Sequence, residues 1–195
     1  MKDYAHTVKE ELAGIVAFVG AIWAAFLVGR LLHLHLEAFG LVPRRIPGLI
    51  GIAAMPFLHA NFAHLLGNTL PLLILLALLA GSRARSWETV AETALAGGAL
   101  LWLFGRSAVH VGASGLVFGL ASFLIVAGLL EKRIIPLIVS LLVGFLYGGT
   151  LVWGVLPIAG YGVSWDGHLA GAIAGVAIAF AQIRESGPQA GNPSR

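Results

Sequence analysis

The chain has 195 residues, of which 58% are hydrophobic and only 11% are charged. A soluble domain carries about 25% charged residues, so this composition and a mean hydropathy of +0.92 indicate a membrane protein. The lack of cysteine excludes disulfides, thiol catalysis and cysteine-bound zinc, and a scattered net charge of +3 argues against nucleic-acid binding.

Six stretches are apolar enough to cross a bilayer, which requires roughly 17–25 residues in a helix. In chain order they lie near residues 12–32, 64–81, 89–105, 112–130, 134–153 and 167–183. The segment 46–62, IPGLIGIAAMPFLHANF, contains two prolines, and we interpret it as a loop at the membrane interface. The sequence therefore predicts an all-α polytopic membrane protein whose six-helix domain covers residues 12–183.

Residues 1–11 are expected to form a cytoplasmic segment, and residues 184–195 a disordered cytoplasmic tail. Basic residues in short loops set the orientation of such a bundle. With the N-terminus in the cytoplasm, the inner side holds eight of them: Lys2, Lys9, Arg83, Arg85, Lys132, Arg133, Arg184 and Arg195. The outer side holds four: Arg30, Arg44, Arg45 and Arg106. We expect both termini in the cytoplasm, in the plasma (inner) membrane of a prokaryote.

In this orientation the second, fourth and sixth spans all enter the membrane from the outer side. Their first turns carry His64 and Asn68, then Ser114, then His168. Polar side chains inside a membrane protein are candidates for function, and these lie at a similar depth. The sequence thus predicts one polar site that opens to the outer side.

His64 and Asn68 are four residues apart, so they share one face of the second span. Both side chains can donate hydrogen bonds to an oxyanion, which contributes roughly 10²–10³ in rate per donor. The alternative is a pair of interfacial residues that cap the helix entry.

Ser114 opens the fourth span within Gly112-Ala113-Ser114-Gly115. The first amides of a helix have no intrahelical partner, and the helix dipole makes that end positive, which suits a developing oxyanion. The alternative is a small packing residue or an N-cap.

His168 lies in WDGHLAGAIAG, where Gly167, Gly171 and Gly175 form one face of the sixth span. Gly115 and Gly119 give the fourth span a matching face, and such faces let two helices approach closely. His168 would then lie within about one turn of Ser114 and could act as its base. The alternative is a histidine that stabilises the bundle through a backbone carbonyl.

Other chemistries fit less well. A zinc set of His59, His64, His110 and His168 would leave the serine turn unexplained. Asp166, the only acid near either candidate, points to another side of the helix from His168, so a Ser–His dyad is expected. Phe118 shares the face of Ser114 and is positioned to pack against the imidazole. No metal and no cofactor are expected.

Three motifs in the order H-x-x-x-x-H-x-x-x-N, G-A-S-G and G-H-x-x-G closely resemble the rhomboid intramembrane serine proteases. The resemblance covers about residues 12–183 and implies a six-helix bundle with a water-filled cavity. It implies Ser114 as nucleophile and His168 as general base. It also implies an oxyanion hole made of His64, Asn68 and the Ser114 backbone amide, with Gly112 shaping the turn.

The implied activity is an endopeptidase that cleaves transmembrane proteins in or near their spans, with membrane proteins and the lipid bilayer as partners. The chain departs from the family pattern at three points. The loop after the first span lacks a Trp-Arg pair, and Gly167 stands where the family commonly has an alanine. Phe118, which has no hydroxyl, stands where the family often has a hydroxyl-bearing aromatic residue. Two alternatives remain: a catalytically silent rhomboid-like protein that binds membrane spans, and a small transporter, which would predict an internal repeat.

Overall fold

The computed structural model describes residues 7–83, 85–131, 133–158 and 162–186. These residues contain six long helices: α1 (Val8–Leu31), α3 (Phe62–Ser82), α4 (Ser86–Phe104), α5 (Ser114–Glu131), α6 (Ile134–Gly154) and α7 (Trp165–Ser186). Each predicted span coincides with one of them. The prediction of an all-α polytopic bundle is confirmed.

Five of the six helices are long and apolar enough to cross a membrane by length and composition, and α4 is the exception. Its first two turns contain Glu88 and Glu92, which lower its hydropathy. Glu92 accepts a hydrogen bond from Gln182 Nε2 of α7 at 2.9 Å, so this carboxylate has a partner within the bundle. A polar residue on a neighbouring helix thus compensates for the charge on α4.

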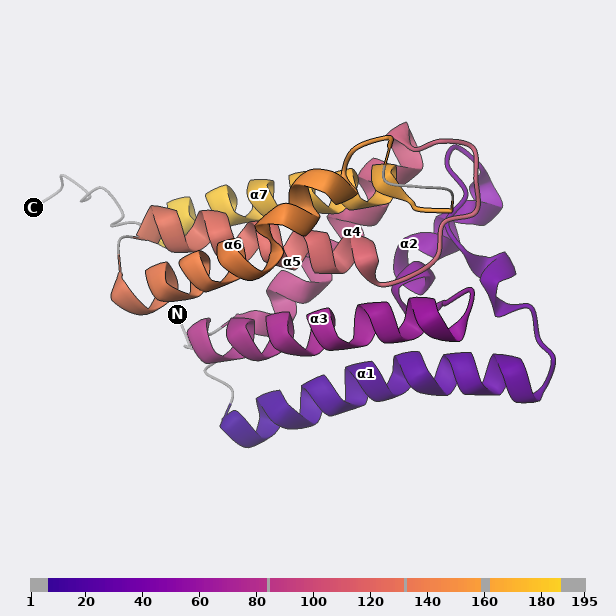
Figure 1. Ribbon diagram of the computed structural model, residues 1–195, viewed down its shortest axis with the longest axis horizontal. Coiled ribbons are helices and arrows are strands. Elements are labelled where there is room, and N and C mark those ends of the chain that lie inside the picture. The colour runs from indigo at the N-terminus through magenta and orange to yellow at the C-terminus, as the bar shows by residue number, and fades with distance from the viewer. Residues whose placement is uncertain (1–6, 84, 132, 159–161, 187–195) are drawn as a thin grey trace, which may run out of the picture.

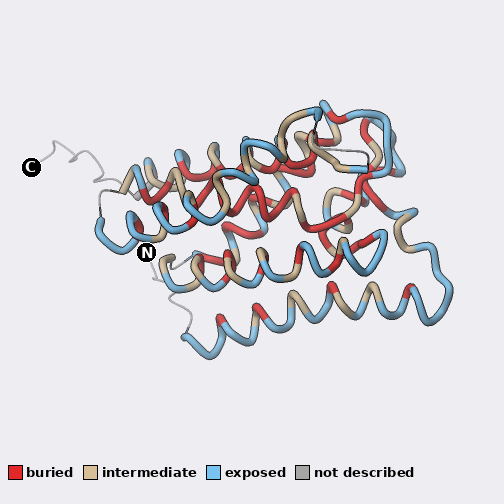
Figure 2. Tube along the Cα trace, viewed as in Figure 1, coloured by how far each residue is buried: buried red, intermediate tan, exposed pale blue. Residues whose placement is uncertain are grey.

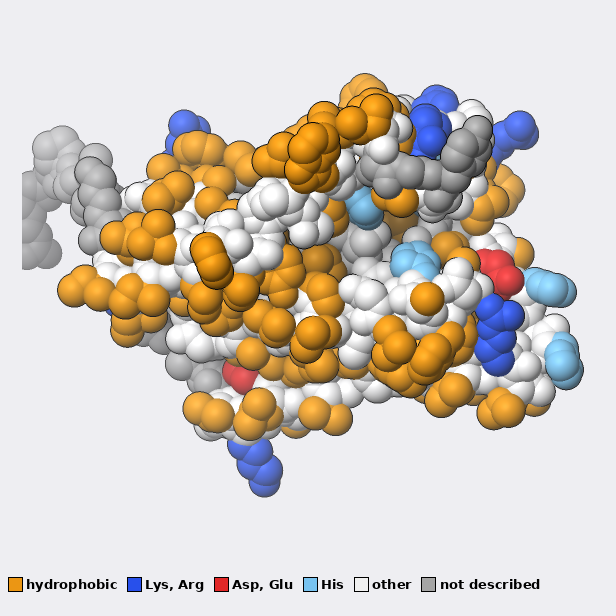
Figure 3. Space-filling model, in the orientation of Figure 1, with side chains coloured by type: hydrophobic (Ala, Val, Ile, Leu, Met, Phe, Trp, Pro, Cys, Tyr) orange, Lys and Arg blue, Asp and Glu red, His pale blue; other side chains and the backbone are white. Residues whose placement is uncertain are grey.

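Helix α5 lies at the centre of the bundle, between α3 on one side and α6 and α7 on the other (Figure 1). Most of its residues are buried, as the red tube in Figure 2 shows. Phe123 is fully buried. A helix that is apolar all round belongs in a core. Helix α1 packs on the face of α3 that points away from α5, and it keeps many apolar side chains exposed. The visible face is mainly hydrophobic, with charged side chains toward its ends (Figure 3).

The backbones of α5 and α7 meet through glycine. A Cβ on Gly171 would collide with the Gly115 carbonyl, and a Cβ on Gly175 would collide with the Gly119 carbonyl. Because no side chain separates these turns, the two helices are held at a fixed distance by backbone contact.

The segment between α1 and α3, here called the first loop (residues 32–61), contains short helical turns instead of a plain loop. They are η1 (Leu36–Phe39), η2 (Ile46–Ile50), α2 (Gly51–Ala54) and η3 (Met55–Phe57). Pro47 and Pro56 each stand in the first turn of a 3-10 helix, where a missing N–H costs little. None of these turns is long enough to span a membrane, as the prediction of a loop required.

Two boundaries differ from the prediction. Helix α1 begins at Val8, inside the segment predicted for residues 1–11, because Thr7 and Glu10 form a capping box that hydropathy does not detect. Helix α7 continues to Ser186, so it includes the first residues of the predicted tail; residues 1–6 and 187–195 lie outside the described residues. The described ends, near Val8 and Ser186, lie at the same end of the bundle (Figure 1).

Candidate active site

Ser114 is the first residue of α5, and it follows a tight turn at Gly112. Gly112 has φ +111°, a conformation that residues with a side chain rarely adopt. Its N–H donates a hydrogen bond to the Met55 carbonyl of the first loop at 3.0 Å, which fixes the turn from outside. Ser114 is therefore presented, half-buried, at a helix start whose amides have no intrahelical partner.

His168 lies in the first turn of α7 and is 9% exposed. Its Nδ1 lies 2.9 Å from the carbonyl oxygen of Gly154, the last residue of α6. A carbonyl can only accept, so Nδ1 carries the hydrogen and the neutral ring keeps Nε2 as its free acceptor. The carbonyl thus selects the tautomer that a general base requires.

Phe118 supports the same ring from α5. Its ring stacks on the imidazole with centroids 4.1 Å apart and an interplanar angle of 11°. The imidazole is therefore held by one hydrogen bond at its edge and one aromatic ring on its face.

Backbone contacts bring the serine and histidine turns together. A Cβ on Gly115 would lie 3.2 Å from the Gly167 carbonyl oxygen, so the residue after Ser114 touches the residue before His168. Gly171, one turn further along α7, contacts Gly115 as well. Among the described hydrogen bonds none joins the Ser114 hydroxyl to the imidazole, and such contacts commonly shorten only when substrate binds.

His64 and Asn68 approach the serine turn from α3. A Cβ on Gly112 would lie 2.5 Å from His64 Nε2 and 3.7 Å from Asn68 Nδ2, so both side chains cover this glycine. Asn68 Nδ2 donates one hydrogen bond to the His64 carbonyl at 2.9 Å, and its second N–H remains for a ligand. Asn61 caps α3 by accepting from the His64 amide at 2.8 Å, which holds His64 in the first turn of the helix.

His59 lies behind His64 and belongs to the first loop. The two rings meet edge to face with centroids 5.0 Å apart, and His59 is 6% exposed. Burial and the neighbouring His64 lower the pKa of His59 to about 4, so the ring is neutral at physiological pH. His59 therefore adds a neutral supporting ring behind the site.

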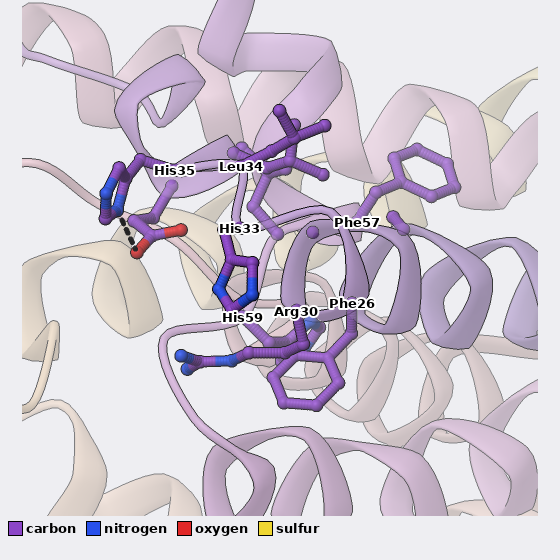
Figure 4. A pocket seen from close by; sticks show the side chains of 12 residues that line it. Phe26, Arg30, His33, Leu34, His35, Phe57 and His59 are labelled. Atoms are coloured by element: carbon purple, nitrogen blue, oxygen red, sulfur yellow. Dashed lines mark ion pairs between the residues drawn. The ribbon is translucent and has the colours of Figure 1, made fainter.

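A separate cavity of about 180 Å³ lies at the end of α1, between that helix and the first loop (Figure 4). Phe26, Arg30, His33 and His59 line it, whereas neither Ser114 nor His168 does. Arg30 donates to the Ala60 carbonyl at 2.5 Å and lies over the Phe26 ring, so it ties α1 to the start of α3. No three His, Asp or Glu side chains of the described residues converge as metal ligands.

Two residues with evident structural roles were missed by the sequence analysis. Arg44 donates to the carbonyls of Leu103 (3.2 Å) and Gly105 (2.7 Å), so it binds the first loop to the end of α4. In the sequence Arg44 stands out only as one of the basic residues of the first loop. Gly154 contributes a backbone carbonyl, and no sequence pattern identifies such a partner.

Comparison with known proteins identifies the family of the chain. The Rhomboid domain family matches residues 48–185, which include every candidate residue named above. The chain is similar to "Uncharacterized protein Rv1337" of Mycobacterium tuberculosis (strain ATCC 25618 / H37Rv), with 38% identity over 92% of this chain and 82% of that protein. It is also similar to "Uncharacterized protein ML1171" of Mycobacterium leprae (strain TN), with 40% identity over 85% of this chain and 69% of that protein. The chain belongs to the rhomboid family and is an integral membrane protein.

Proposed function

We propose that this protein is an intramembrane serine endopeptidase that cleaves transmembrane proteins through a Ser114–His168 dyad. One observation carries the proposal: α3, α5 and α7 each direct a polar first turn to the same place. Backbone contact joins the Ser114 and His168 turns, and His64 and Asn68 cover Gly112. A bundle that needed only packing would have no use for four polar side chains there.

The reaction follows from the roles of these groups. The Ser114 Oγ attacks the scissile carbonyl carbon while His168 Nε2 takes the hydroxyl proton. The carbonyl oxygen becomes an oxyanion that His64, Asn68 and the Ser114 amide stabilise by hydrogen bonds. The imidazolium then returns its proton to the leaving amine as the C–N bond breaks. Water, activated by the same imidazole, hydrolyses the acyl-enzyme and regenerates Ser114.

Substrate access constrains the substrate class. A transmembrane helix has all its backbone groups paired, so its carbonyls are shielded from attack. Spans weakened by glycine or proline, with a small residue at the cut, are therefore the expected substrates. The glycines of α6, among them Gly144 and Gly148, suit a movable gate beside α3. Crosslinking α6 to α3 is therefore expected to abolish cleavage of membrane substrates. Unchanged turnover in the crosslinked protein would disprove the gate.

Orientation belongs to the same proposal. The basic residues of the loops favour an N-in, C-in topology, and the described chain ends lie at one end of the bundle (Figure 1). The site then opens to the outer side of a prokaryotic plasma membrane, where water can enter.

Labelling of the purified protein with a fluorophosphonate tests the activity without knowledge of the substrate. We expect labelling of the wild type and its loss in Ser114→Ala and His168→Ala, with matching loss of cleavage of a model transmembrane substrate. The competing function is a catalytically silent rhomboid-like protein that binds membrane spans without cutting them. Folded wild-type protein that takes no label would favour that alternative, or a cavity that stays shut outside the membrane.

A further inference from the structure

A polar cluster next to the candidate site joins the loop before α5 to the start of α7. Its members are Arg106, His110, Ser164 and Asp166, here called the loop clamp. Asp166 accepts from the Arg106 backbone amide at 2.8 Å and from the Arg106 guanidinium at 3.1 Å. His110 bonds to the Ser164 hydroxyl at 2.7 Å through Nδ1 and to the Arg106 carbonyl at 3.1 Å through Nε2.

The clamp combines two buried side chains, His110 and Asp166, with the half-buried Ser164 and the exposed Arg106. His110 is 3% exposed and Asp166 is 8% exposed, so neither side chain has water as a ready substitute for its partners. Since the Arg106 carbonyl can only accept, His110 donates from Nε2 and in its neutral form accepts the Ser164 hydroxyl at Nδ1. Removing a buried partner from such a network leaves the remaining groups unsatisfied.

The position of the clamp relates it directly to the dyad. His110 precedes Ser114 by four residues, and Asp166 precedes His168 by two. The Ser164 carbonyl also accepts the backbone amide of His168 at 2.9 Å, so Ser164 belongs to the turn that carries the imidazole. The clamp therefore links the backbone that presents the nucleophile to the backbone that presents the base.

Gly167 gives independent support. A Cβ at this position would lie 2.6 Å from the Ser164 hydroxyl oxygen, closer than real Cβ atoms come. An alanine here would thus displace the hydroxyl that bonds to His110. The glycine that departs from the family pattern is what the Ser164–His110 bond requires.

We propose that the loop clamp sets the distance between Ser114 and His168, and that Asp166, His110 and Ser164 are positioning residues for the reaction. The proposal rests on the proposed protease function. A displacement of about 1 Å at a reacting centre can lower a rate by about 10²-fold, so loss of the clamp acts on the chemical step. The clamp residues do not touch the substrate in this role, and substrate affinity is accordingly unaffected.

The first test uses the full-length protein in detergent, with fluorophosphonate labelling rates and kcat and KM for a model transmembrane substrate. Asp166→Ala and His110→Leu are expected to lower the labelling rate and kcat by about 10–100-fold while KM stays within about twofold. His110→Gln is expected to recover much of the loss, because its amide can both donate and accept. Gly20→Ala, at an exposed α1 position with open space around it, is the control.

The second test is a double-mutant cycle that does not depend on removing a buried charge. Gly167→Ala is expected to lower kcat about 10-fold in the wild type but to have no further effect in Ser164→Ala, where no hydroxyl remains to be displaced. In the Ser164→Ala background, the Cβ added at position 167 would lie 3.5 Å from the Cβ of residue 164, which is an ordinary contact. An equal effect of Gly167→Ala in both backgrounds, or wild-type labelling by Asp166→Ala, would overturn the proposal.

Failure of the protease function can be told apart from failure of the clamp. Unlabelled wild type, or label that persists in Ser114→Ala, refutes the function alone. The clamp is then judged by hydrogen exchange at amides 105–113, which Asp166→Ala is expected to accelerate by at least about tenfold over Gly20→Ala. Unchanged exchange would refute the clamp.

Discussion

The imidazole of His168 lies nearly parallel to the ring of Phe118, with centroids 4.1 Å apart and an interplanar angle of 11°. The Gly154 carbonyl holds Nδ1 of the same imidazole. The candidate base thus has two contacts that restrain its rotation, one from α5 and one from α6.

Loss of the stacked ring is expected to slow the chemistry without removing it. An aromatic pair contributes about 0.5–1.5 kcal/mol beyond its buried area, so Phe118→Leu should lower kcat by about 2–12-fold. Steady-state cleavage of a model transmembrane substrate measures this. Phe145→Leu, at a side chain that is 86% exposed on α6, is the matched control. Equal rates in the two variants would show that stacking does not position the base.

The two proposed oxyanion donors are expected to affect kcat more strongly than KM. Asn68→Ala and His64→Ala should each lower kcat by about 10²–10³-fold, because the donors act on charge that develops in the transition state. Thr69→Val, one residue further along α3, serves as control because the Thr69 hydroxyl donates to the Leu65 carbonyl at 2.8 Å and accepts from the Trp23 indole of α1 at 3.2 Å, neither of which belongs to the candidate site. An Asn68→Ala variant with near-normal kcat would remove Asn68 from the oxyanion hole.

The glycine contact between α5 and α7 predicts a position-dependent response to added methyl groups. Gly171→Ala and Gly175→Ala place a Cβ against a carbonyl of α5 and should destabilise the protein by about 1–3 kcal/mol, with loss of labelling. Gly144→Ala and Gly148→Ala meet nothing within 4 Å and should leave stability unchanged or slightly raised. Thermal unfolding in detergent measures both pairs, and equal shifts in them would contradict the close helix contact.

The lowered pKa of His59 predicts a specific pH dependence of stability. The unfolded chain takes up a proton at His59 near pH 6.5, whereas the folded protein does so only near pH 4. The contribution of the neutral His59 to the free energy of unfolding is therefore complete above pH 6.5 and decreases as the pH falls toward 4. Below pH 4 this group causes no further loss of stability. Unfolding temperatures of the wild type and His59→Gln between pH 4 and 7 test this. The variant should show the shallower slope; parallel slopes would mean that His59 titrates normally.

Arg44 is expected to hold the first loop in place. Arg44→Ala removes two hydrogen bonds to the carboxyl end of α4, each contributing about 0.5–1.5 kcal/mol, and should accelerate hydrogen exchange in the first loop. The neighbouring exposed residue Arg45 provides the matched control, Arg45→Ala. Exchange that is the same in both variants would show that the loop is held by other contacts.

Local patterns made much of the fold and the candidate site predictable. Small residues at i, i+4 spacing indicated the α5–α7 contact, and the polar first turns of three spans indicated where Ser114, His168, His64 and Asn68 would gather. Both signals depend only on helical periodicity and on the direction in which each helix crosses the membrane. Hydropathy also located α4, although its two glutamates lower its apolar character.

The contacts that set local geometry were not predictable. Arg44 and Leu103 are 59 residues apart, and Arg106 and Asp166 are 60 apart, so each pairing depends on how a loop folds against a distant helix end. In the sequence these residues resemble ordinary surface charges beside a span. The capping box at Thr7 was readable, but hydropathy placed the start of α1 later because Glu10 and Glu11 are charged.

The hydrogen bond from His168 to Gly154 makes the end of α6 part of the candidate active site. If α6 swings outward to admit a substrate and takes Gly154 with it, the imidazole loses the carbonyl that selects its tautomer. Entry and hydrolysis would then be mutually exclusive states of one molecule: the enzyme would be open and idle, or closed and competent. Membrane proteins that enter the site only briefly would then escape cleavage, because hydrolysis would require α6 to close again around the bound substrate.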